Sequence, residues 1–156
     1  MSRFEPSPLF QFANKLVIPL IRWGVPMGVK RAPMALLTVT GRKSGIPRTT
    51  PVSLASFDDG WLLVAVYGVS DWSQNLEVAG SADVTIRGET TRVKARHLPP
   101  KEAGPILRDS IAGAPALIRR MTSQYFTAGL DSSLEAWAEE SVAHPVFHLT
   151  RARPSI

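Results

Sequence analysis

The stretch from residue 41 to residue 50 concentrates side chains that can hold an anion. It reads Gly-Arg-Lys-Ser-Gly-Ile-Pro-Arg-Thr-Thr, which places three cations and three hydroxyls within ten residues. Glycine on both sides of Arg42, Lys43 and Ser44 lets backbone N–H groups approach a ligand closely. Guanidinium, ammonium and hydroxyl groups bind phosphate or carboxylate oxygens. The pattern therefore predicts a concave anion site, although a hairpin with ordinary solvated charges would contain the same residue types.

Missing residue types exclude several other kinds of chemistry. The 156 residues contain no cysteine, which excludes disulfides, thiolate metal sites and cysteine nucleophiles. His97, His144 and His148 do not form a metal-binding spacing, and neither a Walker loop nor a Gly-x-Ser-x-Gly elbow is present. The net charge of +5 favours an anionic partner, but the basic residues are not interleaved with aromatics, so we expect no nucleic-acid partner.

Strand and turn patterns surround the cationic stretch. We expect strands at Ala35–Thr40, Arg48–Phe57 and Trp61–Tyr67, a helix at Asp71–Ala79 capped by Ser70 or Asp71 and ended by Gly80, and a hairpin of Val84–Arg87 with Thr91–His97. The strand from Trp61 is nearly all apolar, which predicts burial on both faces.

The pattern becomes helical after Pro99-Pro100, with segments around Ile106, at Ala116–Tyr125 and after a cap at Asp131 or Ser132, before a closing strand at Pro145–Thr150. Short strands joined by hairpins favour an antiparallel sheet, so the predicted class is α+β, a small barrel or half-barrel packed with helices. The length suits one domain over residues 1–156.

The N-terminal segment, residues 1–30, contains an amphipathic helix in this interpretation. Leu9, Phe12, Leu16, Leu20 and Trp23 recur at helical spacing, with a bend expected at Pro19. Lys15, Arg22 and the prolines exclude a spanning helix. Covering the core is the ordinary role of such a face; contact with lipid headgroups is the alternative.

The motif Thr40-Gly41-Arg42-Lys43-Ser44-Gly45, followed by Pro47-Arg48-Thr49-Thr50-Pro51, resembles the signature of the deazaflavin-dependent nitroreductase family. These actinobacterial proteins have a split β-barrel fold and bind coenzyme F420. The resemblance continues in Ala65-Val66-Tyr67-Gly68, in Asp71-Trp72-Ser73-Gln74-Asn75-Leu76, and in His144-Pro145-Val146-Phe147. The loop before Trp72 is shorter than in many members, and the C-terminal region offers only Tyr125 where members that reduce nitro-drugs carry several tyrosines.

The resemblance implies a role for each matching position. Arg42, Lys43 and Ser44 would hold the phosphate and acidic tail of the coenzyme. The remaining positions would surround its ring: Arg48, Thr49, Thr50, Pro51, Val52 and Ser53 on one strand, Ala65, Val66, Tyr67 and Gly68 on the facing strand, and Trp72, Ser73 and Asn75 on the short helix. Tyr67 and Ser53 are the candidates for supplying a hydrogen bond or proton to the acceptor.

The implied activity is hydride transfer from reduced F420 to an electron-poor small molecule such as a quinone, an enone or a nitroaromatic. Two alternatives stay open: an FMN-binding barrel, and a non-catalytic lipid or fatty-acid carrier with a long apolar cavity beneath Leu9–Val29. We expect a cytoplasmic monomer or homodimer without a metal, with membrane contact through the N-terminal helix as a variant of this location.

Overall fold

The structure is a computed structural model that describes residues 5–26, 28–29 and 32–153. In chain order its elements are α1 (Pro8–Arg22), β1 (Gly28–Val29), β2 (Ala32–Thr40), β3 (Pro47–Ser53), β4 (Ala55–Phe57), β5 (Gly60–Val64), α2 (Asp71–Ala79), β6 (Ser81–Ile86), β7 (Glu89–His97), α3 (Pro100–Ala112), α4 (Ala116–Thr122), the 3-10 turn η1 (Ser123–Tyr125), α5 (Leu134–Ala143) and β8 (Val146–Arg151).

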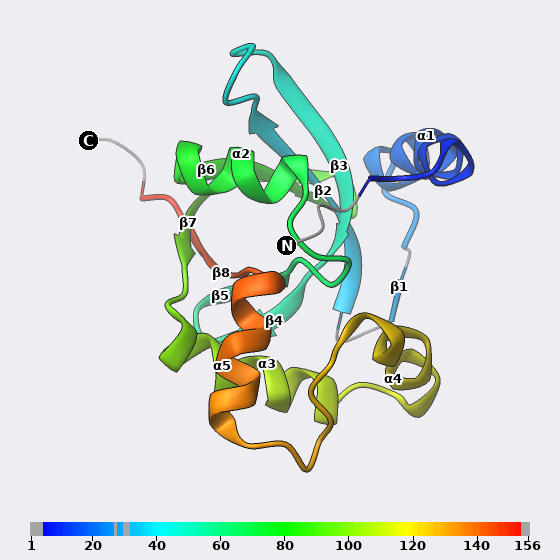
Figure 1. The fold of residues 1–156 in the computed structure, drawn as a ribbon. Coiled ribbons are helices and arrows are strands. Elements are labelled where there is room, and N and C mark those ends of the chain that lie inside the picture. The colour runs from blue at the N-terminus through cyan, green and yellow to red at the C-terminus, as the bar shows by residue number, and fades with distance from the viewer. Residues whose placement is uncertain (1–4, 27, 30–31, 154–156) are drawn as a thin grey trace.

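All the strands pair antiparallel in one curled sheet (Figure 1). The order is β1-β2-β6-β7-β8-β5-β4. In addition, β3 pairs with the edge of β2 opposite to β6. The stretch Pro47–Phe57 is interrupted at Leu54, whose N–H donates to Pro33 O at 3.1 Å. Because its first part lies beside β2 and its second beside β5, this stretch connects the two ends of the path. The sheet is therefore a split barrel, which confirms the predicted α+β class.

The sheet buries an apolar cluster on each face, because neighbouring residues of a strand face opposite sides. Leu63 lies in the inner cluster with Leu37 and Leu149, whereas Leu62 lies in the outer cluster with Trp137 of α5. Each fully buried leucine contributes about 1.5–3 kcal/mol. The apolar run from Trp61 is thus explained by burial on both faces, as predicted.

The helices α3 and α5 pack closely together against the outer cluster (Figure 1). Their close approach depends on Gly104, where a Cβ atom would lie only 2.7 Å from Ala138 N. The predicted helical region is therefore confirmed, with its second segment, Ala116–Tyr125, divided into α4 and the turn η1. Ser133 caps α5 and accepts a hydrogen bond from Ala136 N, one residue after the later of the two expected caps.

The helix α1 is amphipathic as predicted, but its apolar face does not cover the core. Leu9 is 77% exposed and Trp23 is 79% exposed, and Phe12, Leu16 and Leu20 between them are exposed too. The helix instead turns Ile21 inward, which is 1% exposed, and contacts β2, β3 and β6. The helix therefore covers part of the core, as the ordinary interpretation predicts, but it does so through Ile21 and not through the predicted apolar face. Among the described residues, each helix is too short or too polar to cross a membrane.

The strand predicted to reach Tyr67 ends at Val64. Beyond that residue Ala65 N donates to Pro145 O, which precedes β8, and Gly68 N donates back to Ala65 O, both at 2.9 Å. The chain therefore turns away from the sheet, helped by the positive φ of 101° at Gly68. This turn places Tyr67 outside the barrel, immediately before α2.

Candidate functional site

The loop between β2 and β3 is closed by its own hydrogen bonds. Gly41 N donates to Ile46 O and Gly45 N donates to Gly41 O, both at 2.9 Å. The Ser44 hydroxyl accepts from Ile46 N at 3.2 Å, and Gly45 adopts a φ of 71°. A Cβ atom at Gly41 would lie 2.7 Å from Ser44 Oγ. Both glycines are therefore required for this tight loop, and the Ser44 oxygen already serves the loop itself.

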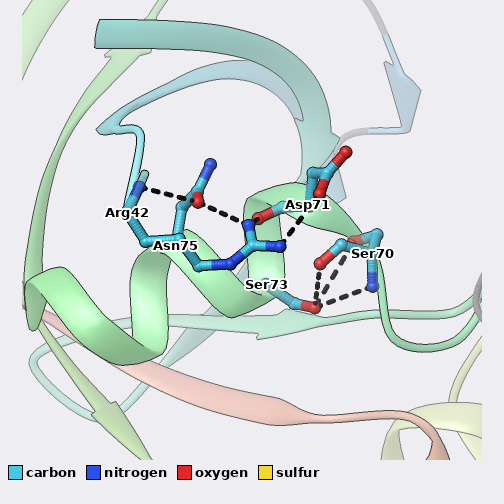
Figure 2. Close-up of polar contacts among 5 residues, drawn as sticks. All are labelled: Arg42, Ser70, Asp71, Ser73 and Asn75. Carbon is cyan, nitrogen blue, oxygen red and sulfur yellow. Dashed lines mark hydrogen bonds and ion pairs between the residues drawn. The ribbon is translucent and has the colours of Figure 1, made fainter. Parts of the chain in front are cut away.

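Arg42 connects this loop to the first turn of α2 (Figure 2). Its backbone N–H and its Nη1 both donate to Asn75 Oδ1, at 3.1 and 2.7 Å, and Nη1 also reaches Asp71 O at 3.4 Å. Its Nη2 pairs with Asp71 Oδ1 at 3.2 Å. We call Arg42, Asp71 and Asn75 the Arg42 network. The network gives the Arg42 guanidinium and the Asn75 carbonyl a structural role, and their predicted contact with a cofactor stays a prediction.

Ser73 is also engaged by the protein itself. Its hydroxyl accepts from Ser70 N at 2.9 Å and donates to Ser70 O at 3.0 Å, and the side chain is 2% exposed. The neighbouring Trp72 packs on the inner cluster, with its ring 6.2 Å from that of Phe147. These two residues stabilise α2 and its position against the barrel. The Ser-x-x-Ser spacing is the sequence signal that indicates this cap.

Lys43 and Arg48 are the cations of the hairpin that remain available. Both side chains are exposed, and neither makes a hydrogen bond or an ion pair with any described residue. Arg48 lies opposite Val39 in the register of β2 and β3. Two unpaired cations beside a rigid loop fit an acidic ligand, because the loop does not need to reorganise to receive it.

The strand β3 presents the predicted ring-binding residues on two faces. Thr49, Pro51 and Ser53 share one face, since alternate residues of a strand point the same way. Thr49 Oγ1 lies 2.8 Å from Thr38 Oγ1 on β2, and Ser53 is exposed. Arg48 and Thr50 share the other face with Val52, which is buried in the inner cluster; Arg48 is exposed at the end of the strand. A ligand outside the barrel therefore meets the first face, and Val52 can contribute only its backbone.

Tyr67 lies in a group of aromatic rings that the sequence did not predict. Its ring meets Phe10 of α1 edge-on at 5.8 Å and Tyr125 of η1 edge-on at 4.9 Å. Burial raises the pKa of the Tyr67 phenol above its ordinary value, and the neighbouring Tyr125 raises this pKa further. The side chain is still 45% exposed. A neutral phenol is therefore held at the surface, while Ala65 and Gly68 on either side are buried.

A cavity of about 340 Å³ lies under α4, lined at its floor by Trp137 and on its walls by Phe126 and Leu130, with Arg119 and Arg120 at its side. The lipid-carrier alternative requires a long cavity beneath Leu9–Val29, and this cavity is not in that place. It gives the carrier alternative no support.

Three solved structures share the fold. An F420-H2 dependent reductase, FDR-A, is 20% identical with a TM-score of 0.50, over 78% of this chain and 96% of its own. A structure described as a domain-swapped dimer is 18% identical with a TM-score of 0.51, over 90% and 98%. An FAD-binding protein from Mesorhizobium loti is 14% identical with a TM-score of 0.51, over 88% and 89%. At these identities the likeness establishes the split-barrel fold.

A family model described as F420H(2)-dependent quinone reductase matches residues 22–119. This range is well over half of the chain, and it contains the hairpin loop, the Arg42 network, Tyr67 and every other predicted site residue. The chain therefore belongs to the F420H(2)-dependent quinone reductase family: it is a reductase, and coenzyme F420 is its cofactor.

Proposed function

We propose that the protein reduces a quinone, with Lys43 and Arg48 holding the acidic arm of F420 and Tyr67 facing the acceptor. The observation that carries this proposal is that Lys43, on the loop fixed to α2, and Arg48, near the start of β3, are exposed and have no hydrogen-bond or ion-pair partner among the described residues. Nitroaromatics and enones are the alternative acceptors. They share with quinones the need for a hydrogen-bond donor where negative charge develops.

The acidic arm suits this hairpin because Lys43 and Arg48 can each make charge-assisted hydrogen bonds to it. Arg42 acts differently in the proposal: by holding the loop against Asp71 and Asn75, it fixes where Lys43 points. Thr49, Pro51 and Ser53 offer the face of β3 along which a flat ring can lie. Trp72 packs on the inner cluster, and Ser73 and Asn75 fix α2 and the loop beside it.

When bound, reduced F420 supplies a hydride. The quinone gains that hydride and one proton and becomes a quinol, while the coenzyme is oxidised. The chain contributes the donor: the Tyr67 phenol is protonated at neutral pH, as an ordinary tyrosine is, and burial raises its pKa further, so it can donate to the carbonyl oxygen on which charge develops. Ser53 on β3 is the second candidate for this role.

The exposed face of α1 supports a further part of the proposal, namely contact with an anionic membrane. Lys15 and Arg22 flank the apolar face, and residues 8–22 contain no acidic side chain. A helix with an apolar face and cationic flanks lies in the lipid interface. Such contact would bring the site close to lipid-soluble quinones at the inner face of the membrane. In the alternative, a second copy of the protein covers the same face of α1 and forms a homodimer. In both cases residues 1–156 form one domain.

Two measurements test the proposal. Fluorescence titration gives the Kd of F420, and anaerobic turnover with menadione, a nitroaromatic and an enone ranks the acceptors. We expect binding that weakens with added salt, since exposed charge pairs are screened, and the highest kcat/KM with the quinone. Absence of F420 binding, or a kcat/KM for the nitroaromatic above that for the quinone, would contradict it. Light scattering with and without anionic vesicles separates membrane contact from dimerisation.

A further inference from the structure

The segment between η1 and α5 is fixed to α5 at successive residues. The Phe126 ring packs 4.5 Å from the ring of His144 and 6.1 Å from that of Trp137. Thr127 N and Ala128 N both donate to Glu140 Oε1, the second at 2.6 Å. Trp137 Nε1 donates to Gly129 O at 3.1 Å. Four consecutive residues are therefore held by one helix, although they have no regular secondary structure of their own.

Glu140 is the centre of this attachment. Its residue exposure is 7%, and a buried carboxylate is costly unless hydrogen bonds compensate it. One oxygen accepts the two N–H groups of the segment, and the other lies 3.5 Å from His144 Nε2. The partners of Glu140 are therefore the segment on one side and a buried histidine on the other. The Glu140 carboxylate therefore contacts the protein and has little contact with solvent.

His144 extends the attachment to the segment that follows β5. Its Nδ1 lies 3.2 Å from Ala65 O, at the point where the chain leaves β5. Ala65 precedes Tyr67 by two residues, and Tyr125 directly precedes Phe126. Tyr67 and Tyr125 thus each lie within two residues of a contact with Glu140 of α5 or with His144 at its C-terminal end.

We propose that Glu140 is a positioning residue that sets the Tyr67–Tyr125 pair, and so the shape of the acceptor side; this role rests on the proposed function. Glu140 holds Tyr125 through the segment from Phe126 to Ala128, and it holds Tyr67 through His144 and Ala65. It does not touch the acceptor. A displacement of about 1 Å in a positioned group can cost about 100-fold in rate, which is the effect that this attachment prevents.

The substitutions that separate geometry from charge are Glu140→Ala and Glu140→Gln. Alanine removes the acceptor that Thr127 N and Ala128 N share, so the segment should move and take Tyr125 away from Tyr67. Glutamine keeps a carbonyl oxygen for both N–H groups, removes the charge, and places an NH2 donor where Oε2 lies beside His144 Nε2. Glu139→Ala is the matched control, because Glu139 is an exposed carboxylate on the same helix turn.

The first readout needs no coenzyme. The chain has two tyrosines, so ultraviolet difference titration of the free protein follows Tyr67 and Tyr125 directly. In the wild type, Tyr67 should titrate above its ordinary value; in Glu140→Ala this titration should move back toward it, and in Glu140→Gln and Glu139→Ala it should not. The second readout is steady-state reduction of menadione. We expect kcat/KM to fall about 10- to 100-fold in Glu140→Ala, with the Kd of F420 within about twofold of wild type.

Circular dichroism melts set an assay temperature at which every variant is folded. A folded Glu140→Ala protein with unchanged tyrosine titration and unchanged kcat/KM overturns the proposal, and so does a Glu140→Gln protein that loses as much as Glu140→Ala. Should Glu140→Ala not fold, Phe126→Leu loosens the same segment while leaving Glu140 in place, and an unchanged titration there also overturns it. If the wild type does not turn over with F420, the proposed function fails, while the titration still decides the positioning role.

Discussion

Arg42 and the pair Lys43 and Arg48 should respond differently to truncation, because the structure engages the first and leaves the others free. In Arg42→Ala, the Asn75 carbonyl loses its shortest hydrogen bond, at 2.7 Å. Asn75 is 6% exposed, so water cannot replace that donor fully. The ion pair to Asp71 adds little, since that carboxylate side chain is 68% exposed.

The expected loss is about 1–3 kcal/mol of unfolding free energy, the contribution of a hydrogen bond from a charged donor, because Asn75 Oδ1 keeps its bond from the backbone N–H of residue 42. For a chain of this size, about 3 °C of Tm corresponds to each kcal/mol, so Arg42→Ala should melt about 3–9 °C lower. Arg42→Lys keeps the charge without the planar fork and should recover only part of this difference.

The double variant Lys43→Ala with Arg48→Ala should behave in the opposite way. Exposed side chains without partners change stability by about 0.5 kcal/mol or less, so its Tm should stay close to wild type. If each exposed cation contributes about 1 kcal/mol to an anionic arm, the Kd of F420 should rise about 30-fold, since about 1.4 kcal/mol corresponds to a factor of ten.

The assays are differential scanning fluorimetry for Tm and deazaflavin fluorescence for Kd, at low and high salt. The salt dependence of Kd should be steep in the wild type and shallow in the double variant. An Arg42→Ala protein with unchanged Tm and a Kd for F420 higher than that of the double variant would refute this reasoning. It would place the Arg42 guanidinium on the cofactor instead of on Asn75.

Three further outcomes are expected. Tyr67→Phe should lower kcat for the quinone more than it changes the Kd of F420. The wild-type rate should persist above pH 10 before it falls, because the raised pKa of Tyr67 keeps the phenol protonated beyond its ordinary value of 10.0. The stability contributed by the neutral Tyr67 phenol is likewise present below pH 10.0 and is lost as pH rises through the higher pKa of the folded state. Phe12→Ser with Leu16→Ser should reduce co-sedimentation with anionic vesicles and leave Tm unchanged, and equal sedimentation would contradict the membrane proposal. Gly104→Ala should destabilise the protein by about 1–3 kcal/mol through overpacking against Ala138, which a lower denaturant midpoint would show.

Local signals predicted the parts of the fold that depend on neighbours in the chain. The helix α2 begins and ends where its Ser70 cap and Gly80 indicated, and Gly80 adopts the left-handed conformation with a φ of 68°. The apolar run from Trp61 predicted β5. The curled sheet followed from the short hairpins, but the break at Leu54 did not, because nothing in the sequence there marks the change of partner from β2 to β5.

Contacts between distant residues account for what the sequence did not reveal. The motif predicts Arg42 as a ligand residue, but its bonds to Asp71 and Asn75 could not be predicted, because these partners lie about thirty positions away in the chain. The apolar spacing of α1 showed the helix but not its orientation, since the same stripe suits a core and a surface. Tyr125 gave no signal of its own, because its place beside Tyr67 is set by Glu140 and His144 on a helix that follows it.

The position of β8 inside the sheet has a consequence for synthesis on the ribosome. This strand lies between β7 and β5, so both neighbours keep unpaired edges until it emerges. A nascent chain that already contains the complete cationic hairpin and α2 would still expose two open edges, and open edges recruit other chains. Translation pauses or truncations before Pro145 should therefore yield aggregates that need a chaperone, and coenzyme binding should become detectable only after the final strand is released.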